Sequence, residues 1–125
     1  MKTAIITQII TKDEQRNEIR ESLDSAWYDF AARYGIRIMP ISYKQRPQEF
    51  DFGLLILSGG NSLNSVESSD SNQLRDVFEK SLLDYAIKNK IPVLAICRGM
   101  QVVNEYFGGK IKKVDGHVRV NHFIK

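Results

Sequence analysis

The single cysteine of the chain, Cys97, stands where a continuously apolar run ends and a helical pattern begins. A thiolate is the nucleophilic form of cysteine, and a helix N-terminus favours it through free backbone N–H groups and the helix dipole. Small residues, Ala95 and Gly99, lie two positions before and two positions after the cysteine. This spacing is typical of a nucleophile elbow, a tight strand-to-helix turn that lifts its central side chain off the sheet. The competing interpretation is a small apolar residue at the edge of the core.

A second loop of unusual composition contains Gly59 and Gly60, directly after the apolar run 52–57. Glycine adopts backbone conformations that are closed to other residues, so backbone N–H groups can face a ligand there. One of these N–H groups, together with that of Arg98, could hold a developing oxyanion. A plain tight turn is the competing interpretation of the two glycines.

Apolar runs of strand length alternate with helical patterns along the chain. Such alternation indicates parallel βαβ units and a three-layer α/β fold with a mainly parallel sheet. Ligands of these folds bind at the carboxyl ends of the strands, and both loops described above leave such an end. The predicted strands span residues 4–10, 36–41, 52–57 and 91–96, with two more expected over 110–114 and 116–125; the predicted helices span 13–34, 73–89 and 99–107; and loops are expected over 44–51 and 58–72.

The composition is that of an ordinary soluble protein, with 42% hydrophobic and 26% charged residues. We therefore expect residues 1–125 to form a single domain. No apolar run reaches the roughly 18 residues that a membrane span requires. Five of the 18 Lys and Arg side chains but one of the 15 acidic ones lie from Lys110 onward, so the net charge of +3 indicates a basic tail and no nucleic-acid partner. One cysteine favours a reducing, cytoplasmic location.

Three stretches, LLILSGGN, the helix with RDVFE, and AICRGMQ, together resemble the class I glutamine amidotransferases. The resemblance covers residues 52–111 and is closest to the γ-glutamyl hydrolase, or peptidase C26-like, branch. Ala95 stands where that branch typically has glycine, and Ser58 stands where many relatives have proline. The stretch SLDSAW is similar to members from bacterial surface-polysaccharide gene clusters. The resemblance implies a flavodoxin-like arrangement of the α/β fold.

The resemblance also implies a role for each position in the two loops. Cys97 would attack the side-chain amide carbonyl of glutamine or of another γ-glutamyl compound and form a γ-glutamyl thioester. The backbone N–H groups of Gly60 and Arg98 would hold the oxyanion. Gln101, one helical turn past the cysteine, would face the bound glutamyl group, and Gly59 would complete the substrate-binding set. Neither a cofactor nor a metal ion is expected.

The side chain of Arg98 is long and charged and emerges near an apolar sheet end, so it needs a carboxylate partner. Asp76 and Glu79 on the preceding predicted helix are the candidates, and bidentate pairing is the expected form. We expect such a pair to brace the elbow as structural support, without taking part in the chemistry.

A thiol nucleophile usually works with a base and with an acid that orients the base. In the family that this chain resembles, a His-x-Glu or similar pair near the end of the domain supplies both. The chain has two histidines, His117 and His122, and no acidic residue after Asp115, so it contains no His-x-Glu pair. The two histidines do not predict a metal site either, because the distant cysteine is not a convincing third ligand.

Three explanations of the missing pair stay open. The chain is a fragment of a longer enzyme, incomplete at its C-terminus; or it is a natural truncated protein; or His117 or His122 serves as an unusual base. The first two explanations predict that these 125 residues alone are inactive. An unpaired apolar sheet edge would then favour aggregation or a homodimer. The parent activity would be γ-glutamyl hydrolysis, or a glutaminase reaction that delivers ammonia to a synthetase partner; the alternative is a catalytically dead binding or regulatory module.

Overall fold

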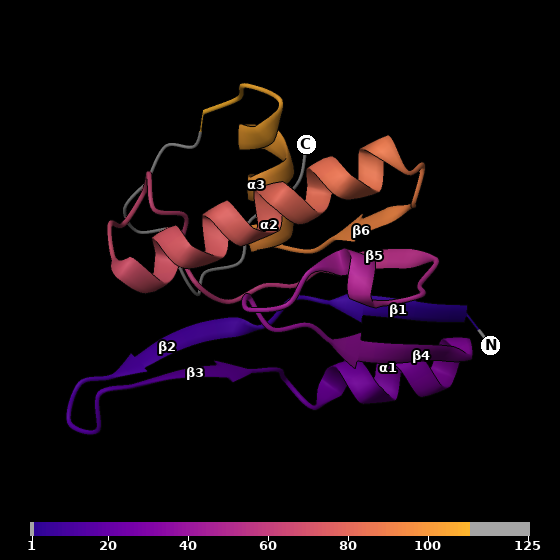
Figure 1. The fold of residues 1–125 in the computed structure, drawn as a ribbon, viewed down its shortest axis with the longest axis horizontal. Coiled ribbons are helices and arrows are strands. Elements are labelled where there is room, and N and C mark those ends of the chain that lie inside the picture. The colour runs from indigo at the N-terminus through magenta and orange to yellow at the C-terminus, as the bar shows by residue number, and fades with distance from the viewer. Residues whose placement is uncertain (1, 111–125) are drawn as a thin grey trace, which may run out of the picture.

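Four parallel strands form the central sheet of the computed structural model, which describes residues 2–110: β1 (Lys2–Ile6), β4 (Ile36–Pro40), β5 (Leu54–Leu57) and β6 (Val93–Ala95) (Figure 1). Their order is β4-β1-β5-β6, so β4 lies on one side of β1 and the chain then crosses to place β5 on the other. Ile5 of β1 accordingly pairs with Met39 and with Leu55. The crossing creates a topological switch point at the carboxyl ends of β1 and β5, where open α/β sheets bind ligands.

Helices cover both faces of this sheet. Helix α1 (Ala26–Tyr34) lies on one face, and α2 (Asp70–Lys88) and α3 (Arg98–Tyr106) lie on the other (Figure 1). Neighbouring strand residues alternate between the two faces, as the period of a strand requires. Ala4, Ile6 and Ile56 pack toward α1 with Leu23 and Trp27, whereas the opposite core contains Ile5, Leu55 and Leu57 of the sheet, Leu82 and Ala86 of α2, and Val102 of α3. The predicted three-layer, mainly parallel α/β fold is confirmed.

The prediction of one helix over residues 13–34 is wrong in its first half. The segment forms an antiparallel hairpin of β2 (Ile9–Asp13) and β3 (Glu18–Ser22), and helical structure starts only at α1. The predicted strand 4–10 accordingly divides into β1 and β2. Ile19 and Trp27 both fit the apolar spacing that indicated one helix. In the structure, however, Ile19 lies on the hairpin and Trp27 lies on α1.

Local hydrogen bonding explains the hairpin. The Asp13 carboxylate accepts the backbone N–H groups of Gln15 at 3.1 Å and of Arg16 at 3.2 Å, and Asn17 adopts φ 52°. Aspartate and asparagine favour such turns because their short side chains bond nearby backbone groups and tolerate left-handed φ. A turn over residues 14–17 therefore replaces the expected helical turn.

The remaining differences lie at element boundaries. Helix α2 begins at Asp70, three residues before the predicted start, because the Ser69 hydroxyl accepts the N–H of Asn72 at 3.0 Å and caps the helix. The predicted loop 44–51 contains a short 3₁₀ helix, Pro47–Glu49. The two strands predicted at the C-terminal end cover residues 110–114 and 116–125. All residues beyond position 110 lie outside the described part of the chain. None of the helices within residues 2–110 has the length and apolarity needed to cross a membrane.

Candidate active site

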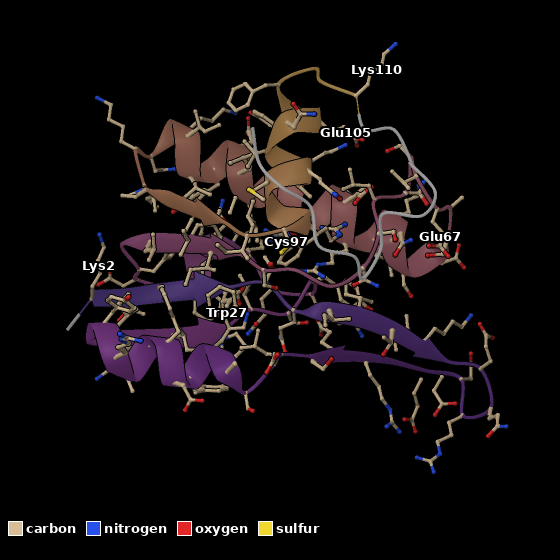
Figure 2. All side chains as sticks on the ribbon, turned by 180° about the vertical axis from the view of Figure 1, so that it is seen from behind. Lys2, Trp27, Glu67, Cys97, Glu105 and Lys110 are labelled. Carbon is tan, nitrogen blue, oxygen red and sulfur yellow. The ribbon has the colours of Figure 1, made fainter. Side chains whose placement is uncertain are left out.

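Cys97 occupies the predicted strand-to-helix turn between β6 and α3. Its backbone has φ 51° and ψ −110°, a left-handed conformation that side-chain-bearing residues rarely adopt, and its side chain is exposed. Figure 2 shows Cys97 at the end of α3 that faces the sheet. A Cβ atom on Gly99 would lie 2.3 Å from the carbonyl oxygen of Leu57, so only glycine lets α3 approach β5 this closely. Such strain persists only where surrounding structure enforces it, which is typical of functional sites.

The loop after β5 lies directly beside this turn. A Cβ atom built on Gly59 would contact the Cβ of Cys97 at 3.5 Å. Gly60 adopts φ 117°, and a Cβ there would lie 2.3 Å from Cγ1 of Ile9. The side-chain amide of Asn61 holds the next position by pairing with both backbone groups of Ile10, at 2.7 and 2.9 Å. The structure therefore brings together the two glycines and the cysteine that the sequence singled out.

Two backbone N–H groups beside the cysteine have no acceptor within residues 2–110. They belong to Gly60 and to Arg98, the two residues expected to supply oxyanion donors. By contrast, the N–H groups of Gly99 and Met100 are used in bonds to Ile96 and Cys97, at 2.8 and 3.0 Å. Among the described residues, nothing therefore competes with a ligand for the two predicted donors.

Both carboxylates proposed as partners of Arg98 contact its side chain. Nη1 of Arg98 donates to Oε2 of Glu79 at 3.0 Å, and Nη2 donates to Oδ1 of Asp76. The second oxygen of Asp76 accepts the backbone N–H of Asn64 at 2.8 Å. All three charged side chains are buried. The expected brace thus joins α2 to the start of α3, and Asp76 also ties it to the loop that follows β5.

Sequence reasoning did not single out Arg75, whose side chain joins Glu79 of α2 to the loop after β5. Its side chain is fully buried, and Nε donates to Oε2 of Glu79 at 2.6 Å. Nη1 donates to the carbonyl of Gly59 at 2.8 Å, and Nη2 donates to the carbonyl and hydroxyl oxygens of Ser58, both at 2.9 Å. The available sequence signal was the spacing within RDVFE, because residues four apart lie on one helix face.

The cluster of Arg75, Asp76, Glu79 and Arg98 balances two positive and two negative charges inside the protein. Burial raises the pKa of Glu79, and attraction to Arg75 and then to Arg98 opposes the rise. Burial likewise lowers the pKa of Arg75, and attraction to Glu79 opposes that change. Removing one member of such a cluster leaves a buried charge without its partner, which costs far more than losing a surface pair.

Gln101 lies in the first turn of α3 with its side chain exposed, on the element that Cys97 precedes. His117 and His122, the candidates for an unusual base, lie outside the described residues. Within residues 2–110 there is no group of three or more His, Cys, Asp or Glu side chains placed to hold a metal ion. An exposed thiol beside two N–H donors that have no acceptor in the described part of the chain is an arrangement suited to acyl transfer, in which a carbonyl carbon is attacked and its oxygen becomes negative.

Comparisons with known proteins agree with this geometry. A model of the peptidase C26 family matches residues 52–123. The γ-glutamyl-CDP-amidate hydrolase of Campylobacter jejuni is 31% identical over 123 residues, covering 90% of this chain and 59% of that protein. A putative glutamine amidotransferase of Schizosaccharomyces pombe is 44% identical over 66 residues, covering 46% of this chain and 26% of that protein.

The fold also matches a solved structure. The crystal structure of SMU.1228c superimposes with a TM-score of 0.54 and 20% identity, covering 85% of this chain and 43% of that one. The chain thus spans less than two thirds of the length of each of these three proteins. Because the family match covers more than half of the chain and includes both the Gly59–Gly60 loop and the Cys97 elbow, the chain belongs to the peptidase C26 family.

Proposed function

We propose that this protein acts on γ-glutamyl amides through a thioester on Cys97. The thiolate attacks the amide carbonyl, a carbon–sulfur bond forms, and the carbonyl oxygen becomes an oxyanion held by the N–H groups of Gly60 and Arg98. Collapse of this intermediate breaks the carbon–nitrogen bond, and the nitrogen takes a proton from solvent water and leaves as an amine or ammonia. Water then cleaves the thioester, which releases glutamate and regenerates the thiol.

One observation supports this proposal most strongly. An exposed cysteine is held at φ 51° between β6 and α3, against Gly59 and beside two N–H groups that have no acceptor within the described residues. A buried structural cysteine needs neither the strained backbone nor the access to solvent. The dipole of α3 and the N–H group of Arg98, which has no acceptor within residues 2–110, also favour the thiolate over the thiol.

The glutamyl part of the substrate is proposed from the relatives and from the position of Gln101. The Campylobacter jejuni relative is named for hydrolysis of a γ-glutamyl compound, and this chain is 31% identical to it. Glutamine and other γ-glutamyl amides share the acyl group that would become attached to Cys97. Gln101 would bind this group from the first turn of α3, with Gly59 and Gly60 on its other side.

Two forms of the reaction differ in the fate of the nitrogen. A glutaminase would pass ammonia to a synthetase partner, whereas a γ-glutamyl hydrolase would release an amine to solvent. Ammonia release from glutamine that depends on an added synthetase would favour the first form. Release from larger γ-glutamyl amides by the isolated protein would favour the second.

A diazo-ketone analogue of glutamine tests the proposal. The full chain is incubated with the reagent, and intact mass and peptide mapping then locate the label. We expect one label per chain, on Cys97, with protection by excess glutamine, and no label after Cys97→Ser. Absence of label in folded protein, or equal labelling of the serine variant, would contradict the proposal.

A catalytically dead binding module is the second candidate. In it, the loops around Gly59 and Cys97 would bind a γ-glutamyl compound without reacting with it. In such a module the amide bond of the bound compound would stay intact. Binding of glutamine measured by calorimetry, with no release of amine or ammonia, would identify this case, whereas steady release would identify a working hydrolase.

A further inference from the structure

The fully buried guanidinium of Arg75 holds two consecutive carbonyl groups of the loop after β5. It donates to the oxygen of Ser58 at 2.9 Å and to the oxygen of Gly59 at 2.8 Å. Because a guanidinium is planar and presents its donors in a fixed fork, two such bonds set the direction of both carbonyl groups. Arg75 therefore determines how the peptide planes of this loop are oriented.

The carbonyl of Gly59 and the N–H of Gly60 belong to one peptide unit. A peptide unit is planar, and none in the described chain is cis, so these two groups point in opposite directions. Because Arg75 binds the Gly59 oxygen, the Gly60 N–H points away from the Arg75 guanidinium. This N–H group has no acceptor within residues 2–110, as an oxyanion donor requires.

The loop itself gives this peptide unit little preference for one orientation. The unit lies between two glycines, which populate positive and negative φ with similar ease. Rotation of the unit by half a turn would exchange the two groups, so that a carbonyl oxygen would face the proposed oxyanion. Other contacts must therefore select the observed orientation. The Gly59 carbonyl accepts from Arg75 at 2.8 Å and from the Ser58 hydroxyl at 3.5 Å, so the bond from Arg75 is the stronger of the two.

We propose that Arg75 is a positioning residue that holds the Gly59–Gly60 peptide in the orientation required for oxyanion binding. The inference rests on the proposed function, because it assigns a task to that site. Arg75 touches neither the thiol nor the substrate and acts through the backbone alone. Glu79 extends its effect, because the same oxygen accepts from Arg75 at 2.6 Å and from Arg98 at 3.0 Å. One carboxylate thus connects the supports of both proposed donors.

The test uses two substitutions and two reagents on the full chain. Arg75→Lys keeps the charge but loses the fork, and Arg75→Met removes both. Release of nitroaniline from γ-glutamyl p-nitroanilide measures acylation, which needs the oxyanion donors. Alkylation by iodoacetamide measures exposure and ionisation of the thiol, and it forms no oxyanion. Circular dichroism and thermal unfolding establish that each variant is folded.

We expect acylation to fall about 100-fold in both variants, as when one oxyanion donor is lost. Alkylation should change by less than about threefold, because the elbow keeps its contacts with Asp76 and Glu79. Unchanged acylation would overturn the proposal. A parallel fall in both reactions, or full rescue by lysine, would also overturn it, because then only stability or charge is at stake.

A third variant serves as a substitute if the single variants fail to fold. Arg75→Met combined with Glu79→Gln leaves Arg98 paired with Asp76 and restores the balance of buried charge. A crystal structure of this or of either single variant gives a readout independent of activity. The Gly59 carbonyl should be rotated away from its present direction; an unmoved peptide would overturn the proposal. If the unmodified protein releases no nitroaniline, the proposed function fails, while the structural readout still decides the role of Arg75.

Discussion

At the residue scale, the site depends on two positions with positive φ that have opposite requirements. Cys97 carries a side chain at φ 51°, and its proposed role as a nucleophile requires that side chain, because glycine has no thiol. Gly60 has no side chain at φ 117°, because one would overlap Ile9 and Arg75. Strained backbone of this kind costs of order 1–3 kcal/mol per residue and is retained where surrounding contacts enforce it.

Gly60→Ala should therefore destabilise the protein by about 2–4 kcal/mol, the sum of left-handed strain and overpacking. The new Cβ would lie 2.3 Å from Ile9 Cγ1 and 2.9 Å from Arg75 Nη1. Gly108→Ala is a matched control, since Gly108 also has positive φ, 89°, but no atom of residues 2–110 lies within 4 Å of its Cβ position. Urea unfolding should show a clearly larger loss for Gly60→Ala; equal losses would show that the close approach has no energetic effect.

At the scale of elements, the buried charge cluster joins α2, α3 and the loop after β5. Asp76 alone connects Arg98 to the backbone of Asn64, and Glu79 connects Arg98 to Arg75. The cluster contributes little to the net free energy of folding, because desolvation offsets much of the attraction between buried ions. Its value lies in holding the two loops at fixed positions.

Glu79→Ala and Asp76→Ala should each destabilise the protein by about 3–5 kcal/mol, because each leaves a buried arginine short of its partner. Glu18→Ala is the control: its carboxylate pairs with Arg20 at 2.7 Å on the exposed hairpin, and such pairs contribute about 0–1 kcal/mol. Thermal unfolding gives the comparison. Full stability in both cluster variants would refute the role of the brace.

The contact between α2 and α3 at Glu105 predicts that the stability of the protein depends on pH. Glu105 of α3 accepts from Lys80 of α2 at 2.6 Å and from Ser65 at 2.7 Å. These hydrogen bonds lower the pKa of Glu105 below its ordinary value of 4.5. Because the folded-state pKa is the lower one, the stabilisation is present above about pH 4.5 and is lost as the pH falls through the folded-state pKa.

Glu105→Gln should consequently be less stable than the unmodified protein at pH 7, by up to about 1 kcal/mol since the pair is partly exposed. The difference should shrink as the pH falls below 4.5. Chemical denaturation across this range measures it. A difference that stays constant, or grows on acidification, would show that the carboxylate charge of Glu105 has no part in joining the helices.

At the scale of the whole molecule, the sequence predicted the elements whose structure depends on residues close together in the chain. The apolar strands, α2 and the turn at Cys97 follow from runs, periods and small-residue spacing that lie within a few residues of each other. The hairpin of β2 and β3 was missed because a polar turn, Asp13 to Asn17, outweighed helical spacing.

The contacts of Arg75 with the loop after β5 could not be predicted for a different reason. Its partners Ser58 and Gly59 lie 17 and 16 positions away in the chain, and nothing in the sequence shows that the β5 loop passes over this face of α2. Arg98 was easier, since an arginine at a sheet end needs a carboxylate and RDVFE offered two. Contacts between loops and helices are thus the part of the site that requires the three-dimensional structure.

The central claim is that a γ-glutamyl group becomes attached to Cys97. The most direct measurement is peptide mapping by mass spectrometry after the full chain has reacted with γ-glutamyl p-nitroanilide and has been quenched in acid. We predict one glutamyl acyl group on the peptide that contains Cys97, removable by hydroxylamine as a thioester is. Folded protein without this acyl group, or an equal amount of it in Cys97→Ser, would contradict the claim.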